Sequence, residues 1–376
     1  MGTRTASESS PHPRVWVLFG KGAGGNGQMQ SLADALGWPY EIKQLHHNAL
    51  NGLPNLLLGA TRLTLDREKS SPLEPPWPDL VIAASRRSAP VAQWIRKQSG
   101  GRTKLVHLLH VQAPLGRFDL IVTMPQFRLP ERDNILHVTG VLNRIDPAAL
   151  VDAATVWQPR LAHLPRPWTA LLVGGNSSAY QLDRQTAARL GREAARMSVA
   201  RGGSLLVTTS PRTPPDAADA LAGAIDAPCH VYKWKKDDDA NNPYKGFLAL
   251  ADDFVVTIDS ASLLVEASAT GRPVAVFEWP RRGRDAATTQ NGNVAKSSAG
   301  PASGGGLWHW LWRKAANLGL FKPARDFDAY FAEMRRRGLA HRFGEAAPRE
   351  RRPLDDLERT VARVRALFDL PPENGQ

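Results

Sequence analysis

The sequence predicts an α/β protein built from two Rossmann-like parallel-sheet domains that face a cleft. Short β-branched apolar runs alternate with helical patterns along the chain, which is typical of buried parallel strands and their connecting helices. A strand followed by a glycine-rich turn and a helix occurs twice, around Gly20–Gly27 and around Gly174–Ser178. Pro159, Pro165 and Pro167 lie between the two halves and indicate a domain boundary.

The boundaries follow changes in composition along the chain. We predict a disordered tail over 1–13, an N-terminal α/β domain over 14–165, a C-terminal α/β domain over 166–340 with a mobile loop at 281–306, and a C-terminal tail with a helix that packs back over 341–376. The last helix is expected from Leu357, Val361, Val364 and Leu367, which recur at helical spacing.

Composition narrows the class of protein. The 376 residues are 42% hydrophobic and 22% charged, as in soluble globular proteins with room for two cores. Cys229 is the single cysteine, which excludes a disulfide framework and a cysteine-rich metal site, and we expect no metal. There is neither an apolar run of about 18 residues nor a secretory signal, so we predict a cytoplasmic protein.

The charge balance indicates the chemistry of the partners. A net charge of +12 favours phosphate-bearing ligands or an anionic membrane surface, and no nucleic-acid-binding signature accompanies it. Trp308, Trp310 and Trp312 lie beside arginine-rich segments, which predicts peripheral attachment at the inner face of a membrane. Packing of these tryptophans against the neighbouring domain is the alternative.

Apolar runs predict five strands in the N-terminal domain, each followed by polar or basic residues: Val15–Phe19, Pro78–Ala84, Lys104–His110, Asp119–Thr123 and Ile135–Val138. After the first strand, Gly20, Gly22, Gly24 and Gly25 allow a ligand or another backbone to approach closely, and a helix is expected from Gln28. The spacing is not that of a P-loop. No acidic residue ends a strand about 20 positions on, as a dinucleotide site would require.

Five further strands are predicted in the C-terminal domain: Trp168–Val173, Ser204–Thr208, Cys229–Tyr232, Asp253–Ile258 and Val274–Phe277. Two helix N-termini, at Gly174–Ser178 and at Ser260–Ser262, are expected at the carboxyl edge of this sheet together with Arg212. Such a group of donors suits a diphosphate, and Glu266, one turn into its helix, could accept ribose hydroxyls. The alternative is that Asp259 and Ser260 only cap an ordinary helix.

Four motifs in the same order carry a resemblance to a known family. VGGNSSAYQLD, TTSPRTP, NPYKGFLALAD and VTIDSASLLVEASATGRPVAVF closely resemble the elongated-mitochondria (ELM) fission-protein family, over roughly residues 15–338. That family has plant members linked to organelle division and many bacterial members.

More distantly, the layout resembles the GT-B glycosyltransferases, such as the enzyme that adds N-acetylglucosamine to lipid-linked peptidoglycan precursors. The resemblance implies a GT-B-like fold in which the second glycine turn contacts the donor diphosphate, a serine-rich turn and Glu266 hold phosphate and ribose, and Tyr244–Phe247 grips the base. The first glycine loop of the peptidoglycan enzyme carries a histidine, and the nearest residue here is Asn26, so no catalytic base carries over.

We therefore predict metal-independent sugar transfer from a nucleotide-diphosphate donor, without a cofactor, to a membrane glycolipid or lipopolysaccharide. The donor side is expected in the C-terminal domain and the acceptor side in the N-terminal domain, where Asn26, Lys21 and His110 are the catalytic candidates. A non-catalytic scaffold and a sugar-nucleotide epimerase are the alternatives. The predicted nucleotide-sugar-binding residues are Gly174, Gly175, Asn176, Ser177, Ser210, Arg212, Tyr244, Phe247, Asp259, Ser260, Ser262 and Glu266.

Overall fold

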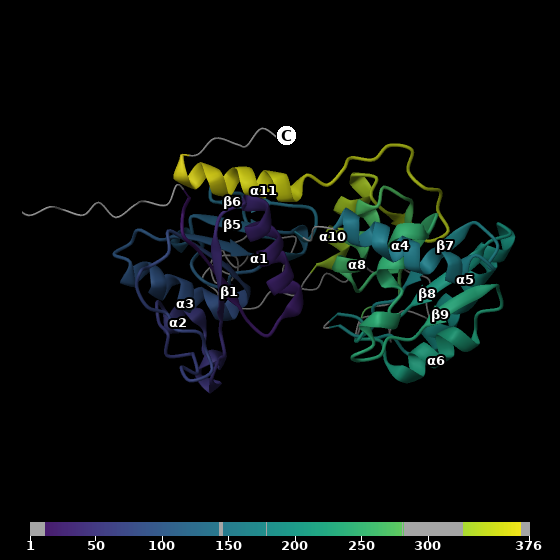
Figure 1. The fold of residues 1–376 in the computed structure, drawn as a ribbon, viewed down its shortest axis with the longest axis horizontal. Helices are drawn as coiled ribbons and strands as arrows, with labels where there is room; N and C mark the ends of the chain where they lie inside the picture. Colours follow the sequence, from purple (N-terminus) through teal and green to yellow (C-terminus); the bar gives the residue numbers. More distant parts are fainter. Residues whose placement is uncertain (1–11, 143–145, 178, 280, 282–325, 370–376) are drawn as a thin grey trace, which may run out of the picture. The chain divides into compact units, whose positions relative to one another are not determined.

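The computed structural model describes residues 12–142, 146–177, 179–279, 281 and 326–369 (Figure 1). Contacts divide these residues into two compact units. Unit 1 holds residues 12–138 and 355–369, and unit 2 holds the other described residues. The predicted mobile loop, apart from Arg281, and the three tryptophans at 308, 310 and 312 lie outside the described residues.

Unit 1 is a parallel sheet of six strands in the order β2-β1-β3-β4-β5-β6. The strands are β1 (Val15–Phe19), β2 (Tyr40–Gln44), β3 (Leu80–Ala84), β4 (Lys104–Leu108), β5 (Leu120–Thr123) and β6 (Ile135–His137). The helices are α1 (Ala23–Leu36), α2 (Asn55–Leu58), α3 (Ser85–Gln98) and α11 (Asp356–Arg365), with 3₁₀ turns η1 (Ala49–Gly52), η2 (Leu115–Arg117), η3 (Pro125–Phe127) and η5 (Ala366–Phe368).

The strand order of unit 1 reverses between β1 and β3. These two strands pair directly, yet the chain leaves β1 towards β2 and leaves β3 towards β4. Helices α1 and α3 therefore begin beside each other, and the position of a Cβ on Gly25 in α1 lies 3.7 Å from the Cβ of Ala84. In open α/β sheets this reversal is where ligands bind.

Unit 2 is a second parallel sheet, in the order β12-β11-β10-β7-β8-β9. Its strands are β7 (Trp168–Leu172), β8 (Ser204–Thr208), β9 (Cys229–Tyr232), β10 (Asp253–Thr257), β11 (Val274–Phe277) and β12 (His341–Arg342). Its helices are α4 (Pro147–Leu161), α5 (Arg184–Ala200), α6 (Pro215–Gly223), α7 (Tyr244–Leu250), α8 (Ala261–Ala269) and α10 (Phe327–Arg336), with the turn η4 (Asp239–Asn241). Here the order reverses at β7, which lies between β10 and β8.

The two sheets confirm the predicted fold class of two Rossmann-like parallel-sheet domains. Two edge strands, β2 and β12, were not predicted. In β2 most side chains face solvent, and the buried one is Lys43, whose ammonium lies 4.4 Å from the centre of the Trp16 ring. Helix α1 begins at Ala23 and not at Gln28, so the glycine run forms its first turns.

The connecting helix α4 belongs to unit 2, although the N-terminal domain was predicted to extend to residue 165. The ring of Trp157 in α4 packs edge-on against Phe247 of α7, with ring centroids 6.2 Å apart. A side chain on Gly246 would collide with Trp157, so glycine permits this close helix contact.

The C-terminal helix α11 packs on α1 in unit 1. The Arg365 guanidinium donates to the Leu36 carbonyl at 2.9 Å, and the Trp38 and Phe368 rings meet edge-on at 5.5 Å. Val364 of α11 is fully buried on the side of this helix that faces the unit. It is one of the four apolar residues whose helical spacing predicted the helix. Among the described residues no helix is long and apolar enough to cross a membrane.

Candidate functional site

Two glycines after β7 are wedged against side chains and backbone from neighbouring strands. The Gly174 N–H donates to Thr257 Oγ1 at 2.8 Å, and the Gly175 N–H donates to Asp259 Oδ2 at 2.9 Å. A Cβ on Gly174 would overlap the Asp259 carboxylate, and one on Gly175, where φ is +146°, would overlap the Arg212 carbonyl. Both positions therefore require glycine, because the β7, β8 and β10 loops meet here at backbone distance.

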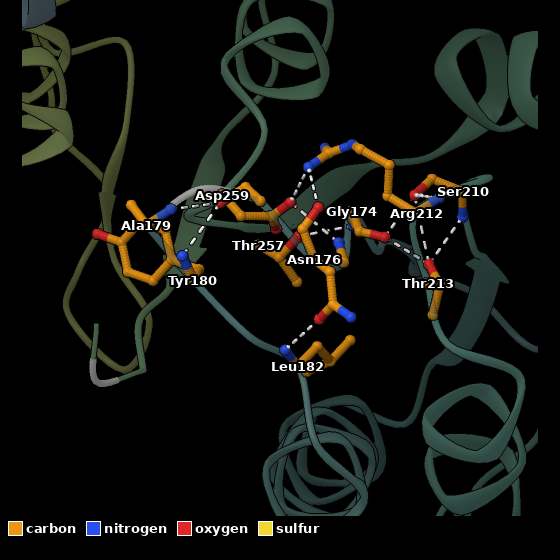
Figure 2. Close-up of polar contacts among 12 residues, drawn as sticks. Gly174, Asn176, Ala179, Tyr180, Leu182, Ser210, Arg212, Thr213, Thr257 and Asp259 are labelled. Atoms are coloured by element: carbon orange, nitrogen blue, oxygen red, sulfur yellow. Dashed lines mark hydrogen bonds and ion pairs between the residues drawn. The ribbon is translucent and has the colours of Figure 1, made fainter. Parts of the chain in front are cut away.

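A buried ion pair lies at the centre of this site, as Figure 2 shows. Arg212 Nη1 is 2.8 Å from Asp259 Oδ2, and the Asp259 side chain is fully buried while that of Arg212 is 40% exposed. Burial raises the pKa of the Asp259 carboxyl, whereas the charge of Arg212 and hydrogen bonds from Thr257 and Gly175 act to lower it. Nη1 also donates to the Asn176 carbonyl at 3.2 Å, so one terminal nitrogen of the guanidinium is fixed in a side chain that still reaches solvent.

Two hydroxyls after β8 fix the Gly174 carbonyl. Ser210 Oγ and Thr213 Oγ1 both donate to it, and the Arg212 N–H donates to Ser210 Oγ at 3.2 Å (Figure 2). The Asn176 N–H donates back to the Arg212 carbonyl at 2.8 Å. The loops after β7 and β8 are thus tied together at both the backbone and the side-chain level, which gives the site a fixed shape.

The rest of the β7 loop is held by its own side chains. Asn176 Oδ1 accepts from the Leu182 N–H at 2.9 Å, and Ser177 Oγ accepts from the N–H groups of Ala179 and Tyr180 at 3.3 and 3.1 Å. Tyr180 is buried, and Arg281 Nε donates to its hydroxyl at 3.3 Å. These contacts set the direction in which the loop leaves the sheet.

The N-terminus of α8 differs from the sequence prediction. Asp259 does not cap this helix, because its carboxylate bonds to Gly175 and Arg212. Ser260 is the N-cap residue and is buried, but its side chain makes no capping hydrogen bond within the described chain. Ser262 lies in the first turn and is half-buried. Within the described residues neither Asp259 nor Ser260 caps the first N–H groups of α8, an arrangement that suits an anion.

Glu266 is paired with a tyrosine. The Tyr244 hydroxyl donates to Glu266 Oε2 at 2.7 Å, and burial, followed by the Glu266 charge, raises the pKa of this hydroxyl well above its usual value. Phe247, three residues further along α7, is fully buried against Trp157 and His230. The structure therefore places Phe247 in the core, where its ring cannot grip a base.

The candidates of unit 1 are more dispersed. The side-chain amide of Asn26 is used at both ends by the Gly20 backbone: Oδ1 accepts from its N–H at 3.0 Å, and Nδ2 donates to its carbonyl at 2.8 Å. Lys21 is exposed, and His110 is buried and stacks on Phe127 with centroids 5.8 Å apart. Asn26 thus shapes the glycine loop, and its catalytic role stays a prediction.

Direct contacts join six of the twelve residues predicted in the C-terminal domain, namely Gly174, Gly175, Asn176, Ser210, Arg212 and Asp259. The same network includes two residues that the sequence analysis missed. Thr257 Oγ1 accepts from the Gly174 N–H, and Thr213 Oγ1 donates to the Gly174 carbonyl. Each lies next to a predicted site residue, Thr257 at the end of β10 two positions before Asp259, and Thr213 directly after Arg212. A hydroxyl at a strand end beside an acidic or basic residue is the signal that could have found them. Among the described residues, no cluster of His, Cys, Asp or Glu could hold a metal ion.

The fold and the site define a class: α/β proteins with two Rossmann-like sheets and a rigid polar site at the carboxyl edge of the second one. Within that class, the chain belongs to the mitochondrial fission ELM1 family, whose model matches residues 23–291. The resemblance inferred from the four sequence motifs is therefore confirmed.

The relatives differ in how much of their length is matched. The chain is 32% identical over 231 residues to "Mitochondrial fission protein ELM1" of Arabidopsis thaliana, which covers 56% of this chain and 52% of that protein. It therefore spans about half the length of the plant relative. It is 26% identical over 298 residues to "Uncharacterized protein RP120" of Rickettsia prowazekii (strain Madrid E), covering 71% of this chain and 83% of that one.

Among solved structures, a similar chain is the "S. aureus MnaA-UDP co-structure", at a TM-score of 0.46 and 12% sequence identity. The similarity covers 97% of this chain and 99% of that one.

Proposed function

We propose that the protein transfers a sugar from a nucleotide-diphosphate donor, and that the carboxyl edge of the sheet in unit 2 holds the donor. The proposal rests chiefly on Arg212, whose half-exposed guanidinium is anchored by the buried carboxylate of Asp259 beside two glycines that admit no side chain. A guanidinium that is fixed by a buried carboxylate and still reaches solvent suits the two phosphates of a nucleotide sugar.

Each contact has a role in this proposal. Arg212 and the N–H groups at the start of α8 stabilise the negative charge that develops on the departing diphosphate, without a metal ion. Glu266, oriented by Tyr244, accepts hydrogen bonds from the ribose hydroxyls. Asp259 is a positioning residue, because it acts on the ligand only through Arg212 and the Gly175 peptide.

We place the acceptor at the glycine loop of unit 1, where Lys21 and His110 are the candidate residues for proton transfer. The space around Gly20, Gly22 and Gly24 is open, so an acceptor can approach the backbone there. A membrane glycolipid or lipopolysaccharide is the proposed acceptor class, in keeping with the net charge of +12.

Calorimetry with UDP-, ADP- and GDP-sugars in the presence of a chelator tests the donor site. We expect one of them to bind, and Arg212→Ala to weaken that binding about 10- to 100-fold, as loss of a charge-assisted contact does. Arg166→Ala is the matched control, because Arg166 is about as exposed as Arg212 and pairs with Asp252 at the same distance, 2.8 Å, at the opposite edge of the sheet. The absence of binding by every nucleotide sugar, or equal loss in both variants, would refute the donor site.

A nucleotide-sugar-binding scaffold without turnover is the second candidate. It is favoured by Asn26, which stands where the peptidoglycan enzyme has a histidine and whose amide is taken up by Gly20. Donor binding without sugar release over hours, in the presence of a lipid extract, would support the scaffold over the transferase. Conversion of the donor to its epimer without any acceptor would instead identify an epimerase.

A further inference from the structure

Four of the six leucines of one segment in unit 1 face solvent. The segment, residues 49–63, spans η1 and α2, and here it is called the leucine segment. Leu50, Leu53, Leu57 and Leu63 are 49%, 45%, 74% and 63% exposed. Single exposed apolar residues are ordinary on protein surfaces, but four in fifteen residues indicate a contact surface.

Polar side chains anchor the leucine segment from the inside. Asn55 is buried, and its Nδ2 donates to the carbonyls of Arg86 at 2.8 Å and Val111 at 3.4 Å. The Arg86 guanidinium donates to the carbonyls of Leu53, at 3.2 Å, and Asn51. The segment is thus fixed with polar side chains inward and four of its six leucines outward.

The ends of the segment are fixed as well. Asn48 Nδ2 donates to the Leu63 carbonyl at 2.8 Å, and Asn48 Oδ1 accepts from the Leu50 N–H at 3.0 Å. The Thr61 N–H donates to the Pro90 carbonyl at 3.1 Å, which ties the segment to α3. The leucines therefore cannot turn inward without breaking these bonds.

The surroundings of the segment are cationic. Between Glu41 and Asp66 the sequence has no acidic residue, and the Asp66 carboxylate pairs with Lys69 at 3.1 Å. Burial, and then the charge of Arg87 and to a smaller extent that of Lys21, lower the pKa of His47, so Arg87, Lys21 and His47 lie close together. They follow three adjacent strands, β2, β1 and β3.

We propose that the leucine segment docks on an anionic lipid bilayer, with its leucines among the acyl chains and the neighbouring cations at the headgroups. Exposed leucines bordered by cations and free of acidic residues are what an interfacial membrane contact requires. A second copy of the chain fits less well, because it would bring the two sets of cations together. Four leucines also cover far less than a stable protein interface, which buries about 1,200–2,000 Å². This proposal does not depend on sugar transfer.

Sedimentation of the full chain with vesicles tests the surface. We expect at least about tenfold stronger partition into phosphatidylcholine vesicles with 30% phosphatidylglycerol than into pure phosphatidylcholine. Leu57→Ser with Leu63→Ser should weaken that partition about tenfold or more. Val151→Ser with Val156→Ser is the matched control, since these exposed valines lie on α4 of unit 2, and it should leave partition unchanged.

A charge variant separates the two parts of the contact. Arg87→Gln should weaken binding to anionic vesicles about fivefold and leave binding to neutral vesicles unchanged. The proposal would be overturned if the leucine variant partitioned like wild type. It would also be overturned if the Trp308→Ser, Trp310→Ser, Trp312→Ser variant lost vesicle binding while the leucine variant kept it. Lipid-free dimers that the leucine substitutions abolish in sedimentation equilibrium would assign the surface to a second copy instead.

Discussion

The glycine turns that open the two units look alike in sequence but differ in what surrounds them. In unit 2, Gly174 and Gly175 are packed against the Asp259 carboxylate and the Arg212 carbonyl, so the protein itself occupies the space of a side chain. In unit 1, no described atom beyond the neighbouring residues and the backbone of α1 lies within 4 Å of a Cβ position on Gly20, Gly22 or Gly24. One glycine turn is therefore required by packing, whereas the other leaves open space for a ligand.

Substitution of these glycines tests that contrast most directly. Gly175→Ala should lower the free energy of unfolding by roughly 3–5 kcal/mol, because the left-handed backbone is strained and the Cβ overlaps Arg212. Gly24→Ala, within α1, should raise it by about 0.5–1 kcal/mol, since alanine favours the helix and meets open space. Urea titration measures both. Similar effects at the two positions would mean that the turns do not differ.

The buried ionisable groups of the two units respond to pH in opposite directions. His107 in β4 is fully buried, its Nε2 donates to the Ser85 carbonyl at 3.0 Å, and burial lowers its pKa to about 4. The unfolded chain binds a proton near pH 6.5 and the folded chain only near 4, so acid favours unfolding. For Asp259 the folded pKa is raised instead, and its contribution falls as pH rises above 3.8.

Stability should therefore decline as pH falls from 6.5 to 4, with a loss of up to about 3 kcal/mol from His107 alone. His107→Gln should flatten this part of the profile, since glutamine can still donate to Ser85 but does not titrate. Urea unfolding at half-unit steps of pH measures the slope. An unchanged slope in the variant would show that His107 is not the group responsible.

The Arg212–Asp259 pair of unit 2 should matter about as much as a partly buried ion pair does. Asp259→Ala should cost about 2–4 kcal/mol, because it removes the acceptor of the Gly175 N–H and leaves Arg212 without its partner. Asp253→Ala, which breaks the pair with Arg201 at the other edge of the sheet, should cost about 1 kcal/mol or less. Equal losses in thermal unfolding would show that burial gives the first pair no special weight.

Local sequence patterns predicted the strands of both sheets well, because a short β-branched run such as β10 needs no distant information. The edge strand β2 was not predicted because it is short and mostly polar, and its buried residue is Lys43 while the apolar Ile42 faces solvent. The long-range contacts could not be predicted. The bonds from Gly174 to Thr257 and from Gly175 to Asp259 each join residues more than 80 positions apart, and only the sheet order brings them together. The sequence therefore indicated which strand ends carry the site, but not that Asp259 would hold Arg212.

The smallest expected effect concerns Asn26, which determines how open the glycine loop of unit 1 is. Asn26→Ala removes two hydrogen bonds to Gly20 in a partly solvated turn, so it should cost only about 1 kcal/mol of stability. Its effect on amide hydrogen exchange should be larger, with faster exchange confined to residues 20–27. The loop loses both hydrogen bonds between Asn26 and Gly20, while the C-terminus of α1 remains capped at Gly37. Asn26→Asp is the informative control, since it keeps the acceptor for the Gly20 N–H and loses only the donor. If both variants exchanged as slowly as wild type, the loop would be held by the start of α1 and not by Asn26.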